Sequence, residues 1–419
     1  MTNRKTPTIS HHLRVWFFVF VTCLLMVVTH AVAQPEGKVL SDNGSSKPVS
    51  SKTVSVVDYG AMGNGQQDDA TAIQKALDSG AEVVTIPSGV YRIGCTLWIG
   101  SGVTLKADPQ AVIRLADGAG NHVSVFLLAN RNPGNGNNHI TVEGGVWDGN
   151  NEHNSRGKDG DLFAYTGTAI NFVNVRHLVL RNLTVRNPDA FSIRLGEVED
   201  FLVEDIVLDH SVVRPNQDGV HVGGFSQRGI IRRIKAVNPN TPNDDMVALN
   251  ADDDVERVLN LGMRRGPIRD ILVEDLQADG AYTFVRILSK ESLIENITVR
   301  RVKGSCRFYA VNMTNWRFPI GSGDIRNVRL EQFNITKTDY KEWAPSLINI
   351  KLKVRDLYIR DFQRGDNPKT TQASTLFLSN GQENTIQSAD DRRQSSSGFS
   401  IPQGGIRELW INRSSNLQP

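Results

Sequence analysis

Three aspartates in two short segments are the residues best suited to chemistry. Asp218 lies in the segment NQDGVHV (216–222), and Asp244 and Asp245 lie in the segment NDDMVAL (243–249). Each segment is an acidic turn followed by a strand in which two apolar residues flank one residue that points the other way. Crowded carboxylates shift one another's pKa values, so that one carboxyl can stay protonated while another is ionised. The three aspartates are therefore candidate catalytic acid and base groups.

The two segments share one strand phase. Val220 and Val247 are 27 residues apart and begin equivalent apolar patterns. If the two strands are neighbouring repeats, Asp218 and Asp245 hold the same position and stack at a strand spacing of roughly 4.8 Å. His221 then projects outward beside Asp218, which makes it a candidate substrate contact.

Strand patterns recur along the middle of the chain, as such a repeat requires. Each reads as a strand, a polar pair that bends the chain and a second strand, and successive patterns begin roughly 24 to 41 residues apart, which is typical of solenoids. No long helical period of apolar residues competes with them after about residue 80. We therefore predict an all-β fold, a right-handed parallel β-helix whose coils bury apolar side chains against the coils above and below. The patterns begin at Arg176, Asp200, Arg228, Arg269, Ile294, Arg326 and Val354.

The first 33 residues have the composition of a secretory signal peptide. Basic residues precede an apolar run of about 14 residues, and Ala-Val-Ala ends at residue 33. The run is shorter than the roughly 20 residues that span a bilayer. Residues 34–53 are predicted to be a flexible leader, because they are rich in Ser, Lys, Gly and Asn. We expect a secreted protein, extracellular or periplasmic, with no membrane span.

Residues 54–419 are predicted to form a single β-helix domain. A cap (54–95) contains a helix that begins at Asp68 or Asp69 and covers the open end of the solenoid. Coils follow over about 96–365, and 366–419 is expected to be irregular. The formal charge of +2 argues against a nucleic-acid partner. Beyond the signal peptide, Cys95 and Cys306 are expected to be two buried thiols rather than a bridge.

No metal or other cofactor is expected, and the protein is expected to be a monomer. His221 has no second histidine at ligand spacing. The run Asp252-Asp253-Asp254 is expected to be a solvated loop more readily than a Ca²⁺ site. Arginines at the coil bends are expected to form a solvated outer face. They are Arg232, Arg233, Arg264, Arg265, Arg300 and Arg301.

The order of several segments resembles known families. Residues 58–93 resemble the N-terminal cap of the pectate lyase superfamily of β-helix proteins. From about residue 144, GVWDGN (145–150), NPDAF (187–191) and the two aspartate segments are similar to the polygalacturonase family of glycoside hydrolases. The resemblance covers roughly residues 54–365 and implies a hydrolase that degrades a polysaccharide such as pectin.

The resemblance also implies a role for each aspartate. In that family, three aspartates at these positions invert the anomeric centre. Asp244 would be the general acid, and Asp218 with Asp245 would hold and deprotonate the water. Inversion needs acid and base carboxyls roughly 6.5 to 9.5 Å apart.

The chain departs from the family one and two coils later. The family has Gly-His-Gly where the histidine position falls on Thr283, and Arg-x-Lys where this chain has Asn312 and Thr314. Thr283 and Asn312 are therefore candidate substrate contacts of altered chemistry. Arg286 projects onto the same face, where it either holds an anion of the substrate or pairs with a site aspartate.

Three function classes remain open. The first is an inverting glycoside hydrolase, and the second is a Ca²⁺-dependent polysaccharide lyase that uses an arginine as base. The third is a noncatalytic glycan-binding β-helix, because the fold alone does not decide function. Aromatic residues that can stack on sugar rings or along the core are Tyr282, Tyr309 and Trp316.

Overall fold

The computed structural model describes residues 52–157, 165–314, 322–379, 384–388, 392–395 and 399–414. The predicted signal peptide, all but the last two residues of the leader, and Trp316 lie outside these ranges. Among the described helices, none has the length and apolar character needed to cross a membrane.

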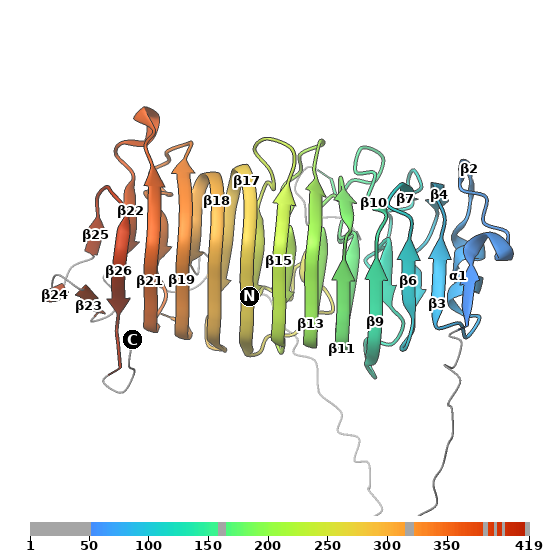
Figure 1. The fold of residues 1–419 in the computed structure, drawn as a ribbon, viewed down its shortest axis with the longest axis horizontal. Coiled ribbons are helices and arrows are strands. Elements are labelled where there is room, and N and C mark those ends of the chain that lie inside the picture. Colours follow the sequence, from blue (N-terminus) through green and yellow to red (C-terminus); the bar gives the residue numbers. More distant parts are fainter. Residues whose placement is uncertain are drawn as a thin grey trace, which may run out of the picture. The chain divides into compact units, whose positions relative to one another are not determined.

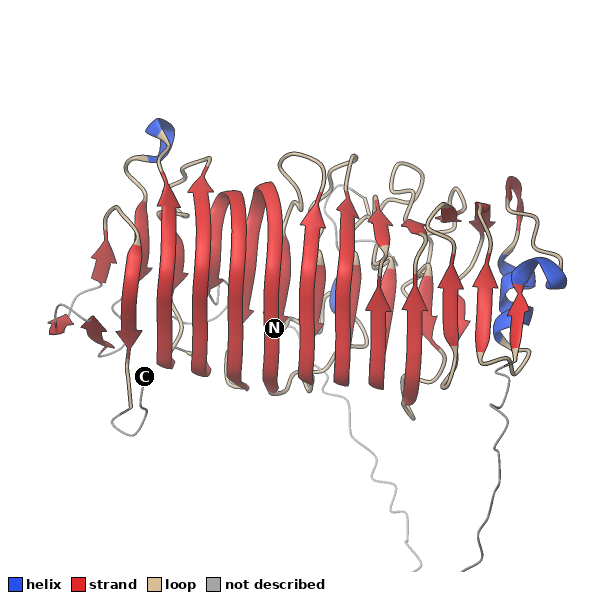
Figure 2. Ribbon diagram, viewed as in Figure 1, coloured by secondary structure: helices blue, strands red, loops and turns tan. Residues whose placement is uncertain are grey.

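The described chain is built almost entirely of strands, with helix confined to short segments (Figures 1 and 2). The helical segments are η1 (Val56–Tyr59), α1 (Ala70–Leu77), η2 (Val258–Asn260) and η3 (Pro368–Thr370). The strands are β1 (Thr53–Ser55), β2 (Asn64–Asp68), β3 (Val83–Ile86), β4 (Gly89–Ile93), β5 (Leu97–Ile99), β6 (Thr104–Ala107), β7 (Ala111–Leu115), β8 (Leu128–Asn130), β9 (Asn137–Glu143), β10 (Val146–Asp148), β11 (Ile170–Arg181), β12 (Thr184–Arg186), β13 (Ile193–Asp209), β14 (Val220–Gly223), β15 (Gln227–Ala236), β16 (Asp245–Asn250), β17 (Ile268–Leu288), β18 (Leu293–Met313), β19 (Asp324–Lys337), β20 (Ser346–Ile350), β21 (Val354–Gly365), β22 (Ser374–Leu378), β23 (Asn384–Ser388), β24 (Arg392–Ser395), β25 (Phe399–Ile401) and β26 (Ile406–Ile411).

Parallel pairing links each coil to the next, as the all-β prediction requires. Val220 of β14 pairs with Val247 of β16, which confirms the 27-residue repeat. Both valines are fully buried in the continuous core. The residues that alternate with them form one column on the outer face of this sheet. In order along the stack, the column is Asn171, Arg194, His221, Ala248, Arg286, Asn312 and Asn349.

The predicted polar pairs do bend the chain, and they also fix the register between coils. The second residue of each pair takes positive φ, for example 56° at Asp205 and 54° at Arg233. The first residues alternate in charge from coil to coil, so that each faces an opposite charge on the neighbouring coil. This charge ladder runs Lys106, Glu143, Arg181, Glu204, Arg232, Glu274, Arg300, Glu331, Arg360, Glu408.

Most of the bend arginines are exposed on the outer face, as expected, and several of them also pair with acidic residues of the neighbouring coil. Arg232 lies 2.7 Å from Glu204, and Arg300 lies 2.7 Å from Glu274. These groups are partly exposed, so each pair adds little stability. A register slip of one residue, however, would break the matched pairs together.

Helix α1 forms where a capped helix was predicted, but the two aspartates divide the work differently. Asp68 accepts the backbone N–H of Ala70 at 2.9 Å, which caps the first turn. Asp69, the N-cap residue, accepts the N–H groups of Met62 and Gly63 instead. The apolar side of α1 joins the core through Ile73 and its neighbours.

The C-terminal segment differs from the irregular structure expected there. β26 pairs antiparallel with β21, and β25 pairs antiparallel with β22. Returning strands cover exposed edges of the last coils, where open backbone groups would otherwise remain. Of the two thiols expected to be buried, Cys306 is buried but Cys95 is exposed.

Candidate active site

A cavity of about 590 Å³ is lined by residues of β14, β16, β17 and β18 and of the segments that flank these strands and β20. All three aspartates line it, together with three of the four predicted substrate contacts. Those three are His221, Arg286 and Asn312.

The three aspartates converge, as the shared strand phase predicted. One carboxylate oxygen from each of Asp218, Asp244 and Asp245 lies within 4.8 Å of the others. Two oxygens at that spacing can both accept hydrogen bonds of about 2.8 Å from one water. The spacing is shorter than the gap expected between the acid and base carboxyls of an inverting enzyme.

The environment drives the acidities of the aspartates apart. Burial raises the pKa of Asp244 well above its ordinary value, and the neighbouring Asp245 and Asp218 raise it further. Burial also raises the pKa of Asp218, to about 6, although His221 opposes the shift. A carboxyl that stays protonated therefore lies beside one that ionises near neutral pH, which suits an acid and base pair.

Arg286 is an ion-pair partner of the aspartates. Its Nε donates to Asp245, and its guanidinium lies 3.8 Å from Asp244. β16 and β17 are adjacent strands, in which Asp245 pairs with Thr283 and Ala248 pairs with Arg286. Arg286 therefore starts one strand away from Asp245 and three residues further along, which its long side chain can span. Of the two roles open to Arg286, the structure shows the pairing with site aspartates.

His221 bridges two carboxylates. Its Nδ1 lies 2.7 Å from Asp218, and its Nε2 lies 2.5 Å from Asp253. Phe191 stacks on the ring, with 4.0 Å between ring centroids. Burial disfavours the imidazolium, but Asp253 and Asp218 outweigh burial and raise the pKa of His221 to about 10. The ring is thus a fixed cation beside Asp218.

The solvated-loop interpretation of Asp252 and Asp253 was wrong. Asp253 holds His221, and Asp252 is buried and accepts the backbone N–H groups of Lys290, Glu291 and Ser292. The sequence feature that could have indicated these roles is the position of the aspartate run, directly after the strand that follows Asp244 and Asp245.

We expect His221→Gln to move the acidic limb of the kcat/KM profile to higher pH by about one unit or more. The base must be ionised, so activity falls as the pH drops through the pKa of Asp218. Removing the imidazolium removes the group that holds this pKa down. The profile measured from pH 4 to 8 is the test. Asp253→Asn leaves the His221 contact with Asp218 in place and should shift the limb less; an unshifted limb in His221→Gln would contradict the assignment.

Thr283 does not line the cavity, which corrects its prediction as a substrate contact. It stands in register between Asp245 and Tyr309 and is fully buried, because the side chains of neighbouring coils close over it. Its Oγ1 has no hydrogen-bond partner among the described residues. Asn312 does line the cavity and accepts a hydrogen bond from Asn349 at 2.9 Å.

An aromatic wall stands beside the aspartates. Tyr282 and Tyr309 were predicted candidates, and Trp343 joins them from the loop before β20. The Trp343 ring lies 6.3 Å from that of Tyr282 and 6.5 Å from that of Tyr309, and the residue is 52% exposed. No sequence pattern pointed to Trp343, because it lies outside the repeating strands.

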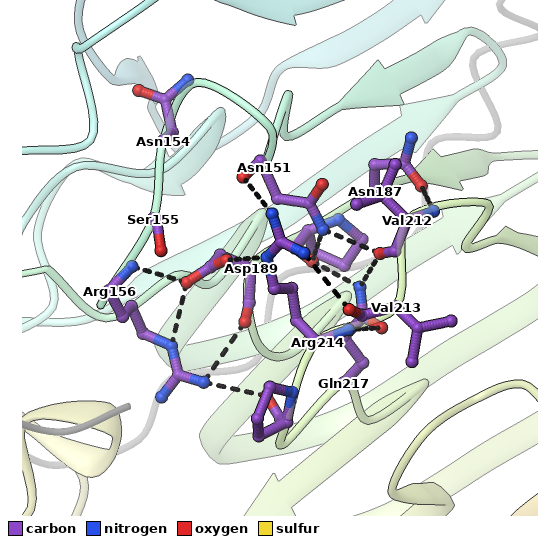
Figure 3. Close-up of polar contacts among 12 residues, drawn as sticks. Asn151, Asn154, Ser155, Arg156, Asn187, Asp189, Val212, Val213, Arg214 and Gln217 are labelled. Carbon is purple, nitrogen blue, oxygen red and sulfur yellow. Dashed lines mark hydrogen bonds and ion pairs between the residues drawn. The ribbon is translucent and has the colours of Figure 1, made fainter. Parts of the chain in front are cut away.

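The turn before Asp218 is held by a buried polar cluster, with Asp189 between Arg156 and Arg214 (Figure 3). Gln217 donates to the carbonyl oxygen of Pro188 at 2.7 Å, and its Oε1 accepts the N–H of Arg214. These contacts fix the turn from both sides. The predicted family segment NPDAF therefore positions Asp218 instead of reacting itself.

The three carboxylates lie close enough together to share a cation, because one oxygen of each lies within 4.8 Å of the others. A guanidinium already supplies positive charge there, because Arg286 forms ion pairs with Asp245 and Asp244. The geometry therefore favours acid and base chemistry over a metal-dependent lyase.

Comparison with known proteins shows which families and structures the chain resembles. The family model described as "Rhamnogalacturonase A/epimerase, pectate lyase-like" matches residues 53–242. The match covers 190 of the 419 residues, which is less than half of the chain. The match includes Asp218 and ends just before Asp244 and Asp245.

The chain is also similar to proteins of different kinds. It is 27% identical over 183 residues to plasmin and fibronectin-binding protein A of Streptococcus pneumoniae, covering 40% of this chain and 25% of that protein. It is 24% identical over 279 residues to an exopolygalacturonase of Zea mays, covering 59% of this chain and 64% of that protein. The chain therefore spans about a quarter of the first relative and less than two thirds of the second.

A solved structure shows the same fold. The exopolygalacturonase from Thermotoga maritima superimposes with a TM-score of 0.54 at 14% identity, covering 84% of this chain and 95% of that chain. This similarity supports the parallel β-helix architecture.

Proposed function

We propose that this protein is an exported glycoside hydrolase that cleaves a polysaccharide in the cavity above β14, β16 and β17. The observation that carries the proposal is that one oxygen from each of the three carboxylates lies within 4.8 Å of the others. The pKa of Asp244 is raised, while Asp218 lies beside the charged ring of His221. A pectic substrate is supported by similarity to a rhamnogalacturonase family model and to an exopolygalacturonase. The architecture that carries the site is part of the proposal, namely right-handed coils whose N-terminal end is covered by α1.

In the proposed reaction Asp244 gives its proton to the glycosidic oxygen as the bond from that oxygen to the anomeric carbon breaks. A water held between Asp218 and Asp245 attacks the anomeric carbon and loses its proton to one of these carboxylates. Proton exchange with solvent then restores Asp244. Attack from the face opposite the leaving group inverts the anomeric centre, and inversion requires the acid and base carboxyls to move farther apart when substrate binds than the 4.8 Å within which their nearest oxygens lie.

Digestion of a glycan panel tests the class of reaction. A hydrolase leaves a new reducing end, a lyase leaves an unsaturated end that absorbs in the ultraviolet, and a binding protein leaves the glycan intact. Proton NMR of the first product then shows whether the anomer is inverted. An unsaturated end or an uncut panel would contradict the proposal.

We expect plain polygalacturonate to be a poor substrate, with kcat/KM at least about tenfold below that for a glycan whose sugar at the aspartates is neutral. An ionised carboxylate that leaves water needs a charged partner. The family's cations are replaced by Asn312 and Thr314, and Arg286 is already paired. Parallel assays on polygalacturonate, rhamnogalacturonan and neutral polysaccharides measure the preference; a strong preference for polygalacturonate would refute it.

A further inference from the structure

One cationic side chain in the cavity, Lys351, has no acidic partner among the described residues. The cationic side chains that line the cavity are His221, Arg257, Arg286 and Lys351. His221 and Arg286 are held by aspartates, and Arg257 also interacts within the chain. In the part of the chain that the structure describes, no hydrogen bond or ion pair engages the ammonium of Lys351.

Lys351 stands well apart from the aspartates along the cavity. It directly follows β20, and its backbone N–H donates to the carbonyl oxygen of Met313 at 2.8 Å, so it lies on the coil after β18. Asp245 opens β16, and β17, β18 and β20 follow in the stack. Three steps of roughly 4.8 Å separate the two residues by about 14 Å along the stack. They also lie at opposite ends of the strands, because Asp245 is in register with Thr283 and Tyr309, whereas Lys351 lies beside Thr314.

The two ends of the cavity differ in charge. At the aspartate end, Asp218, Asp244, Asp245 and Asp253 surround two cations, so a further carboxylate would meet uncompensated negative charge. At the other end, the described neighbours that line the cavity are neutral. They are Asn312 and Thr314.

The aromatic wall beside the aspartates suits sugar rings. Trp343 is half-exposed, and its ring lies close to that of Tyr309. Aromatic faces of this kind stack on the apolar faces of pyranose rings, and they place no demand on charge. A glycan chain bound in the cavity would therefore have the aspartates and the aromatic wall near one end of the strands, and Lys351 within the same cavity at the other end.

We propose that Lys351 forms an anion subsite that pairs with the carboxylate of a uronic acid residue, while the sugar held at the aspartates is neutral. This inference rests on the proposed function, because it assigns the substrate class of the same cavity. The substrate is a polysaccharide in which acidic and neutral sugars alternate or are spaced apart. Lys351 supplies the positive charge one coil beyond Asn312 and Thr314, the positions at which the family's cations are missing.

Binding measured on an inactive background tests the subsite. In protein carrying Asp244→Asn, calorimetry compares an oligosaccharide of alternating galacturonate and rhamnose with the same compound after its carboxyls are reduced to alcohols. We expect about tenfold tighter binding of the acidic form, which corresponds to one charge-assisted pair, and a weaker preference at high salt. Lys351→Met should reduce the preference to less than about twofold, and Lys351→Arg should keep it.

The matched control is Lys353→Met, which removes an exposed lysine two residues away that does not line the cavity. This control should retain the full preference. If Asp244→Asn protein prefers the acidic oligosaccharide equally with and without Lys351→Met, the subsite is overturned, even if the wild-type protein hydrolyses glycans. A preference that depends on Lys351 in a protein that cuts no glycan would uphold the subsite and overturn only the proposed hydrolysis.

Discussion

Replacing Asp244 with asparagine should lower turnover by about 10²- to 10⁴-fold, while the fold and glycan binding stay intact. The amide keeps the shape of the carboxyl but carries no proton that it can transfer to a leaving oxygen. The raised pKa of Asp244 is the property that this substitution removes, and burial between Asp245 and Asp218 is its cause.

Turnover of the best substrate, measured with circular dichroism and binding on the same preparation, tests this expectation. Asp366→Asn is a matched control, because Asp366 is exposed and does not line the cavity. It should leave turnover unchanged. Unchanged turnover in folded Asp244→Asn protein would instead make Asp245 the next candidate for the general acid.

Replacing Arg286 with methionine should lower the free energy of unfolding by about 3 to 5 kcal/mol. The substitution keeps the length of the side chain but leaves Asp245, which is almost completely buried, without its cation. Asp244 loses the same cation at 3.8 Å. Uncompensated buried charge is among the few causes of destabilisation this large.

Urea denaturation at neutral pH measures the loss. The double variant with Asp245→Asn should recover much of it, because the charge that needed Arg286 is gone. Arg355→Met, at an exposed arginine outside the cavity, should change stability by no more than about 0.5 kcal/mol. Unchanged stability with weakened binding of acidic glycans would mean that Arg286 serves the substrate.

The repeating part of the fold could be predicted because its cause is local. A strand's apolar alternation and the polar pair that bends the chain are visible within about ten residues, and stacking then follows from the need to bury the apolar face. The shared phase of Val220 and Val247 was enough to bring Asp218 beside Asp245, and the observed pairing confirms it. The charge ladder was also present in the sequence, but its alternation becomes visible only when the coils are in register.

What the sequence left open depends on distances between coils and on loops without a repeat. Arg286 had two possible partners, and only the spacing of β16 and β17 decided for the aspartates. Thr283 is fully buried in register between Asp245 and Tyr309, which its own sequence segment did not reveal. Trp343 and Asp253 reach the cavity from loops, whose paths no periodicity constrains. The sequence by itself therefore determined the coils and the meeting of three carboxylates, because both follow from a local period. The tertiary structure decided which charges are already paired and which remain free for a substrate, because that depends on contacts between residues far apart in the chain.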